Sequence, residues 1–364
     1  MAFLLQAGKQ GVGHSPDRCG SRCPLRTASG HGGGILSMEL PALRKREICV
    51  IGNLNVDLLI RGMTSLPEWG REVVGTSHHA FPSGQAGYLA LGLAALEVPV
   101  SVVGVVGDDE AGTGIVRALT DAHVDATGIS KLNGEQTGLT IALVRPDGER
   151  AFVSNIGCSG SFSPELVQRS AHVIARAGLV AVVGLFMIPN LPITRVRELF
   201  AQCRRRGQQT MLDTGWDPKD WGSQTLDDVK ALLSEVDLFL PNLDEAQAIT
   251  GEHDPDAALR ALSSLCAGSV IIKCGSEGSI AQHDDAILRH PAYAVTVIDA
   301  VGAGDSFDAG LLAALADGGT MDGAIRRAHA FAALYVSRES NRYACRAEVD
   351  TFLADQHRSF VESE

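Results

Sequence analysis

Short apolar runs alternate with amphipathic stretches along most of this chain, from Glu47 onward. Runs of about four to eight apolar residues predict strands, and apolar positions three or four apart predict helices. The predicted strands are residues 48–51 with 56–60 as their continuation, 72–81, 100–106, 139–144, 150–155, 179–184, 209–213, 236–240, 269–273, 278–282 and 293–298. The predicted helices are residues 85–97, 111–122, 193–206, 226–234, 243–250, 255–265 and 305–316, followed by a helical C-terminal part.

This alternation of strands and helices indicates an α/β fold with a mostly parallel sheet and helices on both faces. Two segments do not fit such a sheet. Residues 139–155 contain a turn signature at 146–148, which predicts a hairpin, and residues 72–81 are strand-like. We expect them to form a small antiparallel lid, contributed by segments at about 61–81 and 135–157.

The first 37 residues do not share the pattern. They hold eight glycines, four basic residues and a single acid, Asp17. Their only apolar run is too short for a secretory signal, whereas the acid-poor composition leaves a transit peptide open. We expect a disordered leader or a misplaced start before Met38, and one domain over residues 38–364.

Composition excludes several classes of protein. The net charge of −12 argues against a nucleic-acid or membrane-surface binder. The sequence has no uninterrupted stretch of 18 apolar residues, so no membrane-spanning helix is predicted. The eight cysteines form no CxxC pair, which indicates reduced core cysteines. These features favour a cytoplasmic protein that acts on small molecules.

The segment at 299–310, DAVGAGDSFDAG, carries the strongest chemical signal. Its small residues Gly302, Ala303 and Gly304 let backbone N–H groups surround an anion at a helix N-terminus. Asp305 follows at the start of the helix, where its carboxylate can take a proton from a hydroxyl while the amides hold a phosphoryl group. On spacing alone, an N-capping aspartate after a glycine turn explains the segment equally well.

Two further segments place polar side chains after apolar strands. In PNLDE, Asn242 can cap a helix whose dipole Asp244 and Glu245 complement. In GNLNVD, Asp57 needs hydrogen-bond donors, which the hydroxyls of a polyol would supply, although an Asx turn is the simpler structural alternative.

The GAGDSF sequence with the preceding Asp-x-Val resembles the signature of the ribokinase-like, or phosphofructokinase-B (PfkB), carbohydrate kinases. The resemblance extends over residues 47–352 with the motifs in order. It implies a three-layer α/β/α sandwich with a small antiparallel β lid. It also implies that Asp305 is the catalytic base, and that the amides of Gly302, Ala303 and Gly304 hold the charge that develops on the transferred phosphate.

The same resemblance implies the remaining binding roles. Asn242 and Glu245 would organise Mg²⁺ through its waters, because Mg²⁺ usually keeps several waters and contacts few protein ligands. Asp57 and Asn55 would bind sugar hydroxyls. On the nucleotide side, the implied contacts to ATP come from Lys273, Gly275, Gly278 and His329, although a lone helix histidine is as often structural.

One motif departs from the family. In SGQAGY, Gly84 is kept, Ser83 replaces a glycine, and Tyr88 stands where an asparagine that contacts the sugar is expected. Tyrosine is larger and donates one hydrogen bond, so the acceptor pocket must differ from that of a ribose kinase. Residues 339–342 also lack the Gly-Ala sequence typical of members with a monovalent-cation loop. Binding of a monovalent cation is therefore left as a possibility.

We therefore expect an ATP- and Mg²⁺-dependent kinase that phosphorylates a small sugar or sugar derivative. A nucleoside kinase remains an alternative if Tyr88 and Phe81 build an aromatic acceptor pocket. A non-catalytic sugar-sensing relative is a second alternative, supported only by Ser83 and Tyr88. The exposed edges of the lid sheet would allow a homodimer.

Overall fold

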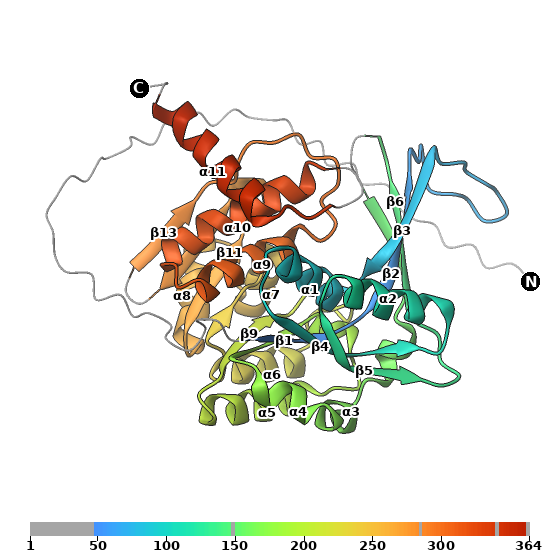
Figure 1. Ribbon diagram of the computed structural model, residues 1–364, viewed down its shortest axis with the longest axis horizontal. Coiled ribbons are helices and arrows are strands. Elements are labelled where there is room, and N and C mark those ends of the chain that lie inside the picture. The colour runs from blue at the N-terminus through green and yellow to red at the C-terminus, as the bar shows by residue number, and fades with distance from the viewer. Residues whose placement is uncertain (1–46, 147–149, 284–285, 339–341, 362–364) are drawn as a thin grey trace, which may run out of the picture. The chain divides into compact units, whose positions relative to one another are not determined.

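The computed structural model describes residues 47–146, 150–283, 286–338 and 342–361, with side chains described up to residue 356 (Figure 1). The predicted leader at residues 1–37 lies outside the described residues. So do the tip of the predicted turn, Asp147 and Gly148, and most of the segment examined for a cation loop.

A central sheet carries the fold. Within the described residues it has nine strands in the order β13-β12-β11-β10-β9-β8-β1-β4-β5. Pairing is parallel from β5 to β11 and antiparallel at β11–β12 and β12–β13, so the expectation of a mostly parallel sheet is confirmed. The strands are β1 (Ile48–Gly52), β4 (Val100–Gly107), β5 (Asp125–Leu132), β8 (Leu179–Val183), β9 (Gln209–Asp213), β10 (Leu238–Phe239), β11 (Ser269–Lys273), β12 (Ser279–His283) and β13 (Ala286–His290).

Helices cover both faces of this sheet because its inner strands are apolar on both sides. In β1, Ile48 and Val50 pack into one hydrophobic cluster, and Cys49 and Ile51 into the other. The first cluster includes residues of α1 (Gln85–Ala95), α2 (Glu110–Asp121), α9 (Ala303–Ala316), α10 (Met321–Val336) and α11 (Arg346–Val361). The second includes residues of α3 (Pro164–Arg169), α4 (Ala171–Arg176), α5 (Ile193–Arg205), α6 (Ser223–Leu233), α7 (Leu243–Thr250) and α8 (Pro255–Leu265). The three-layer architecture is confirmed.

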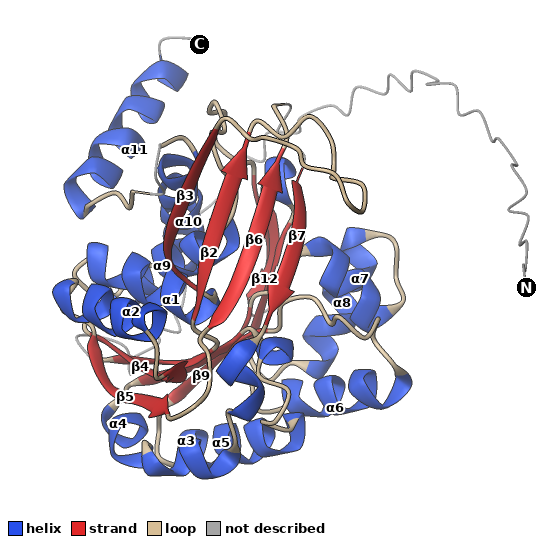
Figure 2. Cartoon of the chain, turned by 90° about the vertical axis from the view of Figure 1, so that its right-hand side faces the viewer, coloured by secondary structure: helices blue, strands red, loops and turns tan. Residues whose placement is uncertain are grey.

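A second sheet of four strands has the order β3-β2-β6-β7 (Figure 2). Its strands are β2 (Asn55–Arg61), β3 (Ser77–Ser83), β6 (Gly138–Val144) and β7 (Arg150–Asn155). Two of its pairings are antiparallel, but β2 and β6 run parallel, so the lid is mixed rather than wholly antiparallel. Strand β2 also corrects the expectation that 56–60 continues the first strand, because it pairs only within this second sheet.

Several strands differ between the prediction from sequence and the structure. The strand predicted at 293–298 is irregular in the structure, and Val297 and Ile298 are exposed. The strand predicted from residue 72 begins only at Ser77. Strand β5 was not predicted because it is half-buried at the sheet edge and its sequence, DATGISKL, is largely polar. Among the described residues, no helix has the length and apolar content needed to cross a membrane.

Gly278 shows how closely the sheet edge is packed. Both Gly275 and Gly278 have positive φ, at +57° and +96°, but a Cβ at Gly278 would lie 1.9 Å from the carbonyl oxygen of His290, whereas a Cβ at Gly275 would meet no atom within 4 Å. The turn between β11 and β12 can therefore accept a side chain at one glycine and not at the other.

We expect Gly278→Ala to destabilise the protein more than Gly275→Ala, by about 1–3 kcal/mol. Both substitutions place alanine at positive φ, but only the first also forces the chain away from His290. Urea denaturation of the two variants measures the difference. Equal midpoints would contradict the packing described for this turn.

Candidate active site

The glycine-rich segment forms a tight turn into α9. Gly302 precedes the helix with φ +78°, and a Cβ there would lie 2.9 Å from the Tyr335 hydroxyl and 3.0 Å from Cδ1 of Tyr88. Glycine is therefore required at this position. At the start of α9, the Ala303 N–H donates to the Ala300 carbonyl oxygen at 3.2 Å, and the Ser306 N–H donates to the Gly302 carbonyl oxygen at 2.9 Å. Asp305 lies in this first turn, beside those amides.

Four carboxylates gather at the carboxyl ends of the central strands around a single lysine. Lys273, at the end of β11, donates from Nζ to Asp213 Oδ2 at 2.7 Å and to Asp308 Oδ1 at 3.1 Å. Asp305 and Glu245 are the other two, and all four carboxylates are buried. This arrangement holds one positive charge within a strongly acidic site.

Burial changes the protonation of this cluster. It raises the pKa of Asp305 well above its usual range, Asp213 raises it further, and Lys273 opposes the rise. Burial and Asp213 likewise raise the pKa of Glu245 to about 7. For Lys273, burial favours the neutral amine, but the charges of Asp213 and Asp308 outweigh it and raise its pKa, so the lysine is an ammonium.

Asn242 and Glu245 form a capping box at the start of α7. The Asn242 side chain accepts from the Glu245 N–H at 2.9 Å, and Glu245 Oε2 accepts from the Asn242 N–H at 3.1 Å. Glu245 Oε1 also accepts from Asn242 Nδ2 at 2.7 Å. Asn242 therefore caps α7, as the sequence predicted. The same hydrogen bonds fix the Glu245 carboxylate beside the acidic cluster.

A cavity of about 260 Å³ connects these groups. Asp305 is part of its wall, and its Oδ1 atom is buried without a hydrogen-bond partner among the described residues. The lining residues are Gln85, Asp213, Asn242, Glu245, Lys273, Gly275, Gly304 and Asp305. The cavity thus brings together the predicted base, both residues predicted for the metal, and part of the anion hole and of the nucleotide site. Its lining does not include Gly302, Ala303, Gly278 or His329.

The donor set of this cavity fits a hydrated divalent cation. No group of three or more His, Cys, Asp or Glu within the described residues is arranged to enclose a metal ion directly. Glu245 and Asp213 nevertheless supply buried carboxylate oxygens to the same cavity. Mg²⁺ commonly keeps several of its waters and contacts few protein atoms, so these residues suit water-mediated binding.

On the acceptor side, the oxygens of Asp57 already have partners within the protein. Asn55 Nδ2 donates to Oδ1 at 2.7 Å, and the Tyr88 hydroxyl donates to Oδ2 at 2.5 Å. Gly84 packs against the segment that precedes Asp57, since a Cβ there would be 2.3 Å from the Asn53 carbonyl oxygen and 2.7 Å from Asn55 Oδ1. Tyr88 therefore binds the carboxylate that the sequence assigned to the sugar, rather than standing free beside it.

The predicted adenine contact, His329, is buried between α10 and β12. Its Nε2 lies 2.8 Å from the Ser279 hydroxyl, and its ring packs edge-on against Phe307 at 4.9 Å. Burial, with a smaller contribution from His290, lowers the pKa of His329 to about 4, so the imidazole is neutral. These contacts give His329 a structural partner, and its role at adenine stays a prediction.

Besides Asp213, to which it gave no role, sequence reasoning missed two of the site's groups. Asp308 received no role, although its spacing of three residues from Asp305 places both carboxylates on one face of α9. Gln85 was passed over at the start of α1, where its side chain lines the cavity. A buried acid in an otherwise apolar helix was the available signal for the first, whereas no sequence signal marked the second.

Curated proteins resemble this chain over most of its length. The chain is 29% identical to the ATP-dependent ribose-1-phosphate kinase of Halopiger xanaduensis, over 84% of this chain and 97% of that protein. It is 27% identical to the ribokinase of Haemophilus influenzae, over 81% of this chain and 94% of the relative.

Solved structures share the fold. The Arabidopsis thaliana ribokinase complexed with ribose and ATP superposes with a TM-score of 0.73 at 22% identity, covering 85% of this chain and 98% of its own. A ribokinase II from E. coli in complex with ATP and Mg²⁺ gives a TM-score of 0.75 at 22% identity, with 85% and 99% covered. The model of the pfkB family carbohydrate kinases matches residues 45–347, most of the chain. The chain therefore belongs to the pfkB family of carbohydrate kinases, which transfer phosphate to an alcohol group.

Proposed function

We propose that this kinase transfers the γ-phosphoryl group of ATP to a hydroxyl of a small sugar or sugar derivative, with Asp305 as the general base. The observation that carries the proposal is the position of Asp305. Its carboxylate is buried and lies in the first turn of α9 beside the glycine-rich segment, and one of its oxygens has no partner in the part of the chain that the structure describes. An acceptor hydroxyl placed there can donate to that oxygen and lose its proton to it.

The surroundings of Asp305 suit this role. A raised pKa makes the carboxylate a stronger base, while the nearby Lys273 ammonium favours its ionised form. The amides of Gly302, Ala303 and Gly304 lie at the positive end of the α9 dipole, where they stabilise charge on the transferred group. Phosphoryl transfer depends mainly on such positioning and charge stabilisation.

ATP and Mg²⁺ are proposed from the same cavity and from the relatives that bind them. Asn242 and Glu245 would hold the metal through its waters, with Asp213 nearby. When bound, Mg²⁺ neutralises charge on the phosphates. Gly275 and Gly278 would let the backbone approach the nucleotide, and Lys273 would attract its phosphates from the floor of the cavity.

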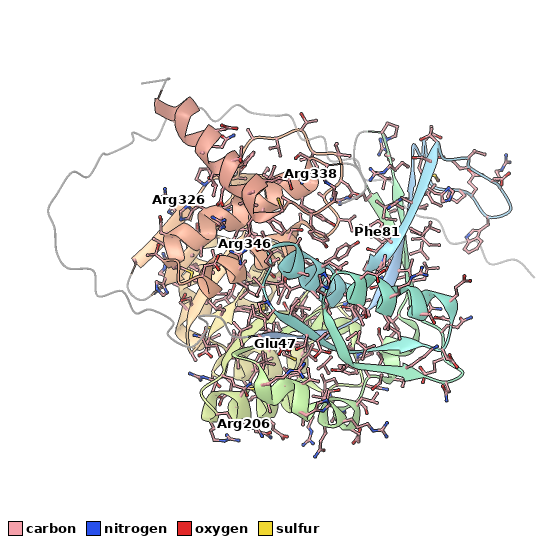
Figure 3. All side chains as sticks on the ribbon, viewed as in Figure 1. Glu47, Phe81, Arg206, Arg326, Arg338 and Arg346 are labelled. Atoms are coloured by element: carbon pink, nitrogen blue, oxygen red, sulfur yellow. The ribbon has the colours of Figure 1, made fainter. Side chains whose placement is uncertain are left out.

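The acceptor site is proposed at Asp57, Asn55 and Gly84, next to Tyr88. An acceptor hydroxyl that binds Asp57 must replace the Tyr88 phenol or share the carboxylate with it. Phe81 of β3, labelled in Figure 3, packs edge-on against the Tyr88 ring with centroids 6.0 Å apart. This aromatic pair is the one feature that favours the alternative of a nucleoside acceptor.

The first test is ATP consumption with Mg²⁺ across sugars, sugar acids, sugar phosphates and nucleosides, with Asp305→Asn as the blank. We expect one class of acceptor to turn over and the variant to lose about 10²–10⁴-fold in kcat, because it lacks the base. Comparable turnover by the variant would overturn the assignment of Asp305. Sugar binding without turnover by the wild type would favour a non-catalytic relative.

The pH dependence of the reaction should reflect the raised pKa of Asp305. The base acts only when ionised, so kcat/KM should fall as the pH drops through that pKa, above the value of about 3.9 for an exposed aspartate. Glu245→Gln tests the assignment, since removing the Glu245 carboxyl should leave this acid limb in place. A profile that stays flat down to about pH 4 would contradict it.

Replacing Tyr88 should expose the dependence of Asp57 on its phenol. In Tyr88→Phe the buried Asp57 oxygen loses its donor, so we expect the free energy of unfolding to fall by about 1–3 kcal/mol in urea denaturation. Saturating acceptor should recover more stability in this variant than in the wild type, because its hydroxyl replaces the phenol. Tyr293→Phe, remote from Asp57, is the control. Equal acceptor effects in both proteins would argue against acceptor binding at Asp57.

A further inference from the structure

An ion pair joins the lid sheet to the segment that forms the anion hole. Arg61, the last residue of β2, donates from Nη2 to Asp299 Oδ2 at 2.8 Å and from Nη1 to the Ile298 carbonyl oxygen at 3.2 Å. The two partners are 238 residues apart in the sequence. The Asp299 side chain is only 2% exposed, whereas that of Arg61 is 28% exposed. The carboxylate therefore depends on this guanidinium for its charge partner.

The second oxygen of Asp299 shapes the glycine turn. Oδ1 accepts from the Val301 N–H at 2.9 Å, directly before Gly302. The backbone N–H groups of Ile298 and Asp299 donate to the Val336 carbonyl oxygen at the end of α10. Since residues 291–300 have no regular secondary structure, these few contacts hold the approach to the anion hole in place. Through its two oxygens, the Asp299 carboxylate connects the Arg61 guanidinium to the Val301 N–H, directly before the glycine-rich segment.

Strand β2 links this contact to the acceptor site. Alternate residues of a strand point to the same side, so Asp57, Leu59 and Arg61 share one face of β2. The first of them is the proposed acceptor ligand, and Leu59 is buried between the other two. A single short strand thus carries the acceptor carboxylate at one end and the tether to the anion hole at the other.

We propose that Arg61 is a positioning residue that clamps the anion-hole segment to the lid, so that β2 sets the acceptor and the phosphate-binding amides in register. The inference rests on the proposed function, since it assigns Arg61 to the reaction at Asp305. An exposed ion pair would contribute little. Here, loss of the guanidinium leaves a buried carboxylate unpaired, which favours movement of the segment that carries it.

Arg61→Ala tests the clamp. We expect kcat to fall by about 10- to 100-fold because the anion-hole amides lose their alignment. The KM for ATP should change by less than about threefold, since the nucleotide contacts lie elsewhere. Arg61→Lys should recover part of the loss by restoring a charge to Asp299. Arg71→Ala is the matched control, because that arginine pairs with Glu68 on the exposed lid loop.

A double variant separates a clamp from a general loss of stability. Asp299→Asn keeps the Oδ1 acceptor for Val301 but removes the charge that Arg61 pairs with. If the two residues act as a unit, the double variant should have a kcat no lower than that of Arg61→Ala alone, because Asp299→Asn also removes the unpaired charge. Effects that multiply would overturn the proposal, and so would a kcat for Arg61→Ala equal to that of the Arg71→Ala control.

Hydrogen exchange provides a readout that does not require turnover. In Arg61→Ala, the amides of residues 301–304 should exchange at least about tenfold faster than in the wild type, while those of β1 should not change. Unchanged exchange at 301–304 would refute the clamp even if kcat fell. Faster exchange in a protein that phosphorylates none of the acceptors would support the clamp and contradict the proposed kinase reaction instead.

Discussion

The buried ammonium of Lys273 is the charge on which the site depends. It donates to Asp213 and Asp308, and it lies near Asp305 and Glu245. Burial raises the pKa values of Asp305, Asp308 and Glu245, and the charge of Lys273 opposes that rise in each of them. A protonated Asp305 could not accept a proton from an acceptor. The same ion pairs that offset the burial of the acidic cluster therefore favour the ionised form of Asp305, which its proposed role as general base requires.

The pairing of β9, β10 and β11 brings Lys273 and its partner Asp213 to the same edge of the sheet. The strands are neighbours in the sheet, so Asp213 and Lys273 reach the same space from β9 and β11. Strand β10 is short, and Asn242 beyond it still makes a parallel bridge to Lys273. That bridge holds the start of α7, and with it Glu245, against the lysine. Backbone pairing thus brings the charges together before any side chain is considered.

Local patterns in the sequence predicted much of this structure. Apolar runs located most strands of the central sheet, and the Asn242–Glu245 spacing predicted the cap of α7. The sheet to which 55–61 belongs was missed, because strand membership depends on pairing between distant segments. The Arg61–Asp299 contact was missed for the same reason. Tyr88 stood out in the sequence as a departure, but its hydrogen bond to Asp57 follows from how α1 is packed against β2, which no local pattern encodes.

The bond between Tyr88 and Asp57 also bears on how acceptors are selected. A buried carboxylate needs donors at all times, and the phenol provides one when no acceptor is bound. A molecule that displaces the phenol must offer a hydroxyl of its own, or the carboxylate is left unsatisfied. Compounds without a suitably placed hydroxyl would therefore bind more weakly, because the broken hydrogen bond to Asp57 is not replaced. The Tyr88 ring also borders Gly302, since a Cβ at Gly302 would lie 3.0 Å from Cδ1 of Tyr88. In the proposed reaction, displacement of the phenol would therefore disturb the segment assigned to the transferred phosphate. If the acceptor binds at Asp57 as proposed, its recognition and the positioning of the phosphate would be coupled through one aromatic side chain.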